Sequence, residues 1–247
     1  MKHRRRCRLI SLAFLPLTVL VLGAPPASAK TYYCFGQSAT IVGTASADTI
    51  YGTTGDDVIY AGRGADVVLG EPLDANDEPI GAGNDLICGG PGNDPVLTGL
   101  NGDDRINGGD GDDNVGGRRE LGSDVLQGNA GADFLRDALD DSGHNVFRGG
   151  GGSDVLVGGD HSASTMYGGD GNDRLTALAP FVADLLYGQA GADTIDSRDW
   201  VQEEGEPPDT FTPDVVNGGA NASDTSDTCL LDLADTYTAC ETTQFGF

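Results

Sequence analysis

Aspartate recurs in this chain about every nine residues, in a frame that reads Gly-Gly-x-Gly-x-Asp-x-U-x, where U is an apolar residue. A short fixed period is the signature of a solenoid, in which each repeat packs against its neighbours. Every repeat places a carboxylate in a glycine turn, so the repeat itself is the candidate binding site. The full frame ends at Asp94, Asp113, Asp154 and Asp173, and close variants end at Asp48, Asp57, Asp66, Asp85, Asp104, Asp124, Asp133 and Asp193.

Each repeat divides into a turn and a short strand. Glycine takes left-handed backbone angles freely, so the first six residues of the frame form a turn. The last three residues can form only a short strand, in which the U residue points inward and its neighbours point outward. Aromatic residues make up only 6% of the chain, so the core is expected to be narrow. The U residues of this predicted core are Ile50, Ile59, Val68, Ile87, Val96, Ile106, Val115, Leu126, Leu135, Phe147, Leu156, Met166, Leu175, Leu186 and Ile195.

The N-terminus has the pattern of a secretory leader. Basic residues up to Arg8 precede an apolar run, residues 9–23, which is too short for a comfortable membrane span. Ala27-Ser28-Ala29 matches a signal-peptidase site, so the mature chain is expected to begin at Lys30. The sequence therefore predicts a secreted, extracellular protein with no membrane span after cleavage.

Removing the leader increases the negative charge. Residues 1–29 hold five of the 14 Lys and Arg residues and none of the 39 Asp and Glu residues, so the mature chain carries 9 − 39 = −30. A chain with this charge is not expected to bind nucleic acid. The charge also opposes compaction unless cations neutralise it, and without them the composition favours disorder.

Four cysteines remain in the mature chain: Cys34, Cys88, Cys229 and Cys240. An even number in an exported chain indicates two disulfides, and three pairings are possible. We favour Cys34–Cys88 and Cys229–Cys240, because each bond would then close one end of the repeat array.

The chain divides into five parts by composition. Residues 1–29 are expected to form the leader, 30–42 an N-terminal cap, 43–196 the repeats, 197–213 an acidic and proline-rich insertion, and 214–247 a degenerate last turn with a C-terminal cap. Caps are expected because the end repeats of a solenoid expose apolar faces.

The oxygen-rich repeat fits calcium better than other metals. Calcium binds carboxylates and backbone carbonyls in flexible geometry, whereas magnesium requires a stricter octahedron. Zinc and copper prefer histidine or cysteine, and the mature chain has only His144 and His161, both in degenerate repeats. Asp-Gly and Asn-Asp also favour turns without any metal, but recurrence at one phase favours ligands. The predicted ligands are therefore the twelve aspartates of the repeat frame.

The frame resembles the RTX-type, or haemolysin-type, calcium-binding repeat, over most of residues 43–196. The resemblance implies an all-β fold, a parallel β-roll in which two nonapeptides make one turn and calcium lies between loops stacked on the same edge. The chain differs from the long members of this family in its N-terminal leader, its cysteines, and the lack of an upstream catalytic or pore-forming domain. It is more similar to small secreted repeat proteins of Gram-positive soil bacteria.

Two nonapeptides per turn place alternate aspartates on opposite edges. We expect one edge to carry Asp57, Asn76, Asp94, Asp113, Asp133, Asp154, Asp173 and Asp193. The other edge would carry Asp48, Asp66, Asp85, Asp104, Asp124, Asn145, Ser164 and Asp184. The second edge loses aspartate and glycine after Asp124, so it should be only partly metallated, with no ion at Asn145 or Ser164. Counting the gaps predicts about five to nine calcium ions per chain.

No motif in the sequence indicates catalysis. The chain has no Gly-x-Ser-x-Gly, His-Glu-x-x-His or phosphate-loop pattern. Aspartate pairs such as Asp103-Asp104 recur once per turn, whereas a catalytic pair should be unique. The sequence therefore favours a secreted calcium-binding protein with a structural or cell-surface role, and no enzyme. The alternative is a calcium-dependent adhesin that binds a glycan or a cell surface. An ice-binding solenoid is disfavoured because the outward positions form no regular threonine ladder.

Overall fold

The computed structural model describes residues 30–116, 122–137, 143–179, 182–198, 212–219, 226–232 and 234–245. The predicted leader, residues 1–29, and most of the predicted acidic insertion, residues 199–211, lie outside the described part. Residues Thr31–Phe247 form one compact unit, and the description that follows concerns this unit.

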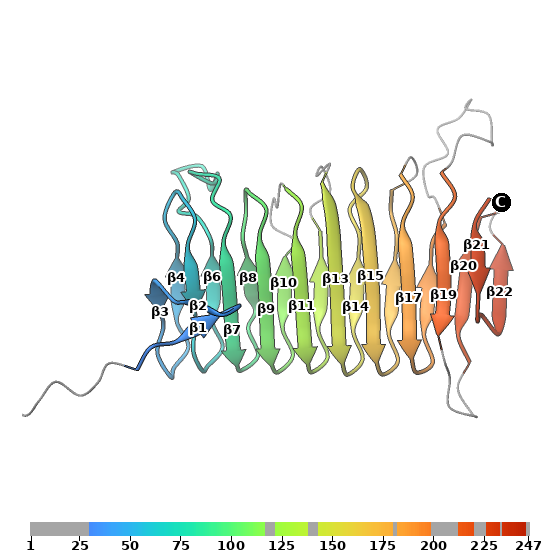
Figure 1. The fold of residues 1–247 in the computed structure, drawn as a ribbon, viewed down its shortest axis with the longest axis horizontal. Coiled ribbons are helices and arrows are strands. Elements are labelled where there is room, and N and C mark those ends of the chain that lie inside the picture. The colour runs from blue at the N-terminus through green and yellow to red at the C-terminus, as the bar shows by residue number, and fades with distance from the viewer. Residues whose placement is uncertain are drawn as a thin grey trace, which may run out of the picture. The chain divides into compact units, whose positions relative to one another are not determined.

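Two ten-stranded sheets, each made of parallel strands, make up most of the unit (Figure 1). We call them the odd sheet and the even sheet, after the numbers of the strands that they contain. The odd sheet contains, in spatial order, β21 (Thr236–Thr238), β19 (Val215–Gly219), β17 (Leu185–Ala190), β15 (Ala163–Asp170), β13 (His144–Gly151), β11 (Val125–Ala130), β9 (Arg105–Asp110), β7 (Leu86–Pro91), β5 (Val58–Tyr60) and β3 (Ile41–Val42). The even sheet contains β22 (Thr242–Phe245), β20 (Thr228–Leu231), β18 (Thr194–Asp196), β16 (Arg174–Thr176), β14 (Val155–Val157), β12 (Phe134–Arg136), β10 (Asn114–Gly116), β8 (Val96–Thr98), β6 (Val67–Leu69) and β4 (Thr49–Tyr51).

Consecutive strands alternate between the two sheets, so two repeats complete one turn. Each strand pairs in parallel with the strand one full turn away, as in Leu126↔Phe147 of the odd sheet and Leu135↔Leu156 of the even sheet. The first edge consists of the loops that lead from the odd sheet to the even sheet. The second edge consists of the loops that lead back. This arrangement confirms the predicted all-β parallel β-roll.

The core between the sheets is the predicted ladder of apolar residues, with one change of register. All the predicted U residues are buried except Val96, whose place is taken by the fully buried Leu97. In most turns the residue after the aspartate donates its N–H to the aspartate carbonyl of the preceding turn, as Asn114 does to Asp94 at 2.9 Å. Pro95 follows Asp94 but has no N–H, so it cannot donate this hydrogen bond. Val96 instead pairs with Val67, and the inward position shifts by one residue.

The N-terminal hairpin, β1 (Tyr33–Cys34) and β2 (Gln37–Ser38), attaches to the odd sheet. Cys34 forms a disulfide with Cys88 of β7, as predicted. The Tyr32 ring stacks on Tyr60 at a centroid distance of 4.9 Å. The disulfide joins residues 54 positions apart, and closing a loop of this length in the unfolded chain contributes about 4 kcal/mol.

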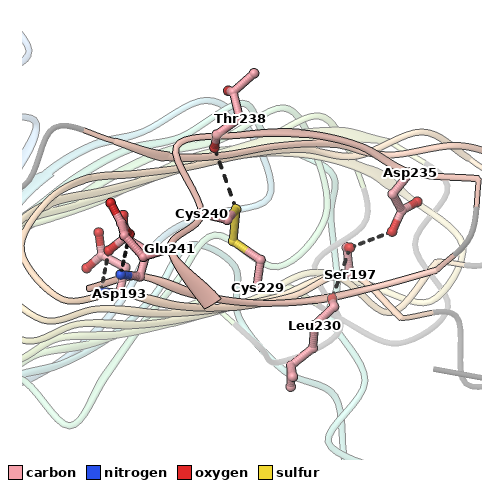
Figure 2. Close-up of a disulfide and its surroundings, with 9 residues drawn as sticks. Asp193, Ser197, Cys229, Leu230, Asp235, Thr238, Cys240 and Glu241 are labelled. Atoms are coloured by element: carbon pink, nitrogen blue, oxygen red, sulfur yellow. Dashed lines mark hydrogen bonds between the residues drawn. A yellow bond between two sulfur atoms is a disulfide. The ribbon is translucent and has the colours of Figure 1, made fainter. Parts of the chain in front are cut away.

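The second predicted disulfide, Cys229–Cys240, closes the last turn. Figure 2 shows this bond with Asp193 and Glu241 to one side of it and Ser197 and Asp235 to the other. Cys229 is fully buried in the core. The bond therefore fixes the final turn to the preceding turns of the roll.

Candidate metal sites

A ladder of carboxylates runs along the first edge. The backbone N–H of each frame aspartate donates to Oδ1 of the aspartate one turn further on; for example, Asp94 donates to Asp113 and Asp113 to Asp133, both at 2.8 Å. One carboxylate oxygen per turn is therefore fixed by the backbone of its neighbour. The members of this ladder, in order, are Asp48, Asp66, Asp94, Asp113, Asp133, Asp154, Asp173, Asp193, Asp227 and Glu241.

The first turns are assigned to the two edges differently from the sequence prediction. Asp66 donates to Oδ1 of Asp94, so Asp66 and Asp48 lie on the first edge. Asp57 donates to Oδ1 of Asp85 and lies on the second edge. The predicted placement of Asp48, Asp66 and Asp57 was therefore wrong.

An insertion explains this error. The step from Asp66 to Asp85 is 85 − 66 = 19 residues, which matches two repeats in length. The segment is instead one repeat with an added loop. In this loop Leu73 forms an antiparallel β-bridge with Pro79. Oδ1 of Asp74 accepts hydrogen bonds from the N–H groups of residues 76 and 78. Asn76 is exposed at this loop and takes no part in either ladder.

The second carboxylate oxygen, Oδ2, is the chemically unusual feature of the ladder. It is buried and has no hydrogen-bond partner in Asp66, Asp85, Asp94, Asp104, Asp113, Asp133, Asp154, Asp173 and Asp193. Leaving one buried polar atom without a partner costs about 1–3 kcal/mol, and more when the group is charged. Repetition of this cost in turn after turn indicates that these oxygens are placed for a cation.

Glycines make room for the oxygens. A Cβ atom on Gly108 would lie 2.4 Å from Oδ2 of Asp113, and a Cβ on Gly111 would lie 2.0 Å from the carbonyl oxygen of Gly92. Backbone carbonyls thus point from one turn towards the next, near the buried carboxylates. Within the described residues, no group of three or more His, Cys, Asp or Glu side chains forms a metal centre by itself. A bound ion would therefore need these carbonyls as well as the carboxylates, which is the ligand set of calcium.

Gly152→Ala should therefore destabilise the roll strongly. Gly152 has φ of +141°, and a Cβ there would lie 1.7 Å from the carbonyl oxygen of Gly131. We expect a loss of at least about 2 kcal/mol. The adjacent Gly151 is a matched control, because a Cβ there has only one neighbour, at 3.9 Å. Gly151→Ala should change the stability by less than about 1 kcal/mol. Urea unfolding in excess calcium tests this pair, and equal midpoints would contradict the tight-turn account.

Burial raises the pKa values of the ladder carboxylates. Burial is the largest cause for Asp113, whose pKa rises to about 7, and the charges of Asp94 and Asp133 add to it. On the second edge the same causes, with Asp124 and Asp85 as the nearest charges, raise the pKa of Asp104 to about 8. The hydrogen bond from the neighbouring backbone N–H opposes both shifts. A cation between the turns would remove the cause of these shifts, because it offsets both desolvation and repulsion.

The second edge has an interruption at Asn145, where an amide replaces the frame aspartate. Its ladder runs from Asp57 through Asp85, Asp104 and Asp124 to Asn145. The Asn145 side-chain NH₂ group donates to Oδ2 of the buried Asp137 at 2.6 Å, and the Ser162 hydroxyl donates to the same oxygen.

Ser164 lies one turn beyond this cluster. Its N–H donates to Oδ1 of Asp184, and its own buried hydroxyl has no hydrogen-bond partner. Asn145 and Ser164 were both predicted to lie without a bound ion, but their surroundings differ. Asp137 was not singled out from the sequence, although it stands where the frame has its first glycine.

The first turn differs from the others in how its carboxylates are bonded. Oδ2 of Asp48 accepts hydrogen bonds from the N–H and hydroxyl of Thr44, at 2.6 and 2.8 Å. Oδ2 of Asp57 likewise accepts the Thr53 N–H at 2.6 Å. These two predicted ligands therefore have protein donors at Oδ2, whereas Oδ2 of ladder members such as Asp94 and Asp113 has none.

The last turns add carboxylates that the sequence analysis missed. Asp193 donates to Asp227, Asp227 to Glu241, and Asp184 to Asp214, each at 2.8 Å. Asp214 and Asp227 each precede an inward residue by two positions, Val216 and Cys229. This Asp-x-U spacing was the available signal, and the long loops before both residues obscured it.

No helix among the described residues is long and apolar enough to span a membrane. A family model, the RTX calcium-binding nonapeptide repeat (4 copies), matches residues 40–72, 81–94, 96–119, 120–137, 139–162, 163–179 and 183–199. A search of the curated proteins finds no relative that matches the chain. The gaps between the matched ranges include residues 73–80 and Pro95, and at both places the structure departs from the regular repeat. With matches over more than half of its length and a β-roll fold, the chain belongs to the RTX calcium-binding nonapeptide repeat family.

Proposed function

We propose that the mature chain is a secreted protein whose β-roll folds around stacked calcium ions and serves a structural or cell-surface role. The supporting observation is the series of buried Oδ2 atoms without partners, one per turn along the first edge from Asp66 to Asp193. The same carboxylate environment recurs at every turn, which favours a structural role for these groups over a catalytic one. The N-terminal leader pattern supports export.

The charge of the chain supports the same proposal. The formal net charge is −25 with the leader included, and carboxylates of one ladder lie one turn apart, close enough to raise each other's pKa values. Divalent cations between the turns would offset this repulsion and stabilise the folded state by mass action, because they bind the folded state alone.

The number of bound ions tests this proposal. On the first edge, successive aspartates from Asp66 to Asp193 enclose six gaps. On the second edge, Asp85, Asp104 and Asp124 enclose two. We therefore expect about eight calcium ions per chain, within the range predicted from the sequence. Native mass spectrometry and titration calorimetry measure this number, and a result of one or two ions would contradict the proposal.

A calcium-dependent adhesin is the second candidate, favoured by one feature of the odd sheet. Tyr167 and Tyr187 stack at a centroid distance of 5.1 Å, and the Arg148 guanidinium lies 5.7 Å from the Tyr167 centroid. Flat aromatic faces with a cationic neighbour are suited to contacts with other molecules. A glycan-array screen in calcium tests this candidate, and the absence of any calcium-dependent binding would leave the structural role alone.

A further inference from the structure

Glu71 is a buried carboxylate that belongs to no repeat. It lies at the start of the insertion on the second edge, and its exposed fraction is 0%. Its two carboxylate oxygens accept hydrogen bonds from two different turns: Oε1 from the Gly83 N–H at 2.9 Å, and Oε2 from the Asn101 N–H at 3.4 Å. The side chain therefore occupies the space between loop 80–85 and loop 99–104.

Regular loops of the first edge use a backbone carbonyl where this second-edge site has Glu71. Gly92 and Gly111 hold the fourth position of the frame. The Gly92 N–H donates to the carbonyl of Asp110 in the next turn at 2.8 Å, and the Gly111 N–H donates to the carbonyl of Ala130 at 2.7 Å. Gly83 holds the same frame position but donates to the Glu71 carboxylate. The insertion thus places a charged acceptor oxygen where the first-edge loops provide a neutral one.

A second carboxylate is directed towards the same place. Oδ2 of Asp85 is buried and has no hydrogen-bond partner, and Asp85 is 0% exposed. A Cβ on Gly70, the residue before Glu71, would lie 2.1 Å from this oxygen. Glu71 also lies near enough for its charge to add to the effect of burial on the pKa of Asp85. An unpartnered buried oxygen beside a buried carboxylate requires a positive charge or a proton.

We propose that Glu71 is a side-chain ligand of a calcium ion held with Asp85 between loops 80–85 and 99–104. Backbone carbonyls of the two loops complete the oxygen set, since no three side chains in the described residues form a centre alone. The number of charged ligands tunes calcium affinity, so this site binds more tightly than the purely repeat-built sites. The proposal rests on the proposed calcium function and adds a residue that the insertion alone supplies.

Glu71→Gln tests the ligand role, because it removes the charge while keeping the size and an acceptor oxygen. Glu78→Gln is the matched control: it removes the same charge from the exposed part of the same insertion. Titration calorimetry and native mass spectrometry with calcium should show the tightest site weakened by about tenfold in Glu71→Gln. At limiting calcium, Glu71→Gln should bind one ion fewer than the wild-type chain and Glu78→Gln.

Each other outcome has a defined meaning. Unchanged counts and affinities in Glu71→Gln, with a calcium-loaded wild-type chain, would overturn the ligand role of Glu71 and leave the proposed function standing. A wild-type chain that binds no calcium would overturn both. Saturating calcium refills a weakened site, so a folding defect of Glu71→Gln that persists at saturation would also contradict the ligand role and assign Glu71 to backbone hydrogen bonding alone.

Discussion

Asp133→Ala is expected to raise the calcium concentration at the midpoint of folding by about threefold, whereas Ser164→Ala leaves it unchanged. Asp133 lies in the middle of the first edge, where its Oδ1 accepts the N–H of Asp113 at 2.8 Å and its Oδ2 has no protein partner. Removing the carboxylate leaves the buried Asp113 N–H without its acceptor and takes a charged ligand from the ions on either side. If these effects total about 5 kcal/mol and folding is linked to the roughly eight ions expected above, the midpoint rises by about threefold.

Ser164→Ala is the matched control on the second edge. Ser164 holds the frame position of Asp133, and its hydroxyl is buried without a hydrogen-bond partner. Replacing an unpartnered buried hydroxyl by hydrogen removes no interaction and is close to neutral. Calcium titrations followed by circular dichroism give both midpoints, and equal midpoints would show that the lost aspartates do not mark lost sites.

Asn145→Ala is a less suitable control, although the sequence alone grouped it with Ser164. Its side chain accepts the Asp124 N–H at 2.7 Å and donates to Asp137 at 2.6 Å. Its loss should therefore destabilise the fold by breaking hydrogen bonds, without removing an ion. Urea unfolding in saturating calcium separates this effect from a change in calcium affinity.

The fold and most of the ladder could be predicted because the repeat is strictly periodic. A nine-residue period with one apolar phase determines which side chains point inward, and it placed residues such as Ile106, Leu135 and Leu175 correctly. The period also placed the aspartates from Asp94 onwards on the correct edges, because their loops keep the six-residue turn on the first edge.

The sequence prediction was wrong at the insertion after Asp66 and at Pro95, and it missed two contacts outside the repeat pattern. From the sequence, an insertion close to one repeat in length cannot be distinguished from a degenerate repeat. Asn76 was therefore given a ladder position, and the three aspartates before it were assigned to the wrong edges. Pro95 shifted one inward position because a missing N–H changes the register while the spacing still looks regular. Asp137 and Glu71 depend on contacts between turns, which periodicity does not report.

Removal of calcium at about pH 8 is expected to abolish most of the β structure, even with both disulfides intact. First-edge carboxylates such as Asp113, whose pKa is about 7, would then be ionised in a buried stack, with Oδ2 atoms that have no partner. The two disulfides together constrain the unfolded chain by about 7 kcal/mol. They act only at the two ends of the roll, through Cys88 and Cys229, and cannot offset repulsion at every turn between them.

Acid should partly replace calcium. Burial first, and neighbouring carboxylates second, raise the pKa of Asp85, Asp113 and Asp173 to about 7, against 3.8 in an exposed aspartate. The ion-free folded state therefore binds more protons than the unfolded state between these values, and its stability falls as the pH rises through this range. The contribution is fully present below about pH 4 and is lost by about pH 8. In chelator, β structure should return as the pH is lowered from about 8 to about 5.

Far-UV circular dichroism of the mature, disulfide-bonded chain, with and without a chelator at about pH 8, is the most direct test of calcium-dependent folding. We predict a β spectrum in millimolar calcium, a largely disordered spectrum in chelator, and recovery when calcium is restored. A β spectrum that chelation leaves unchanged at this pH would contradict the claim that the buried aspartate oxygens are placed for calcium.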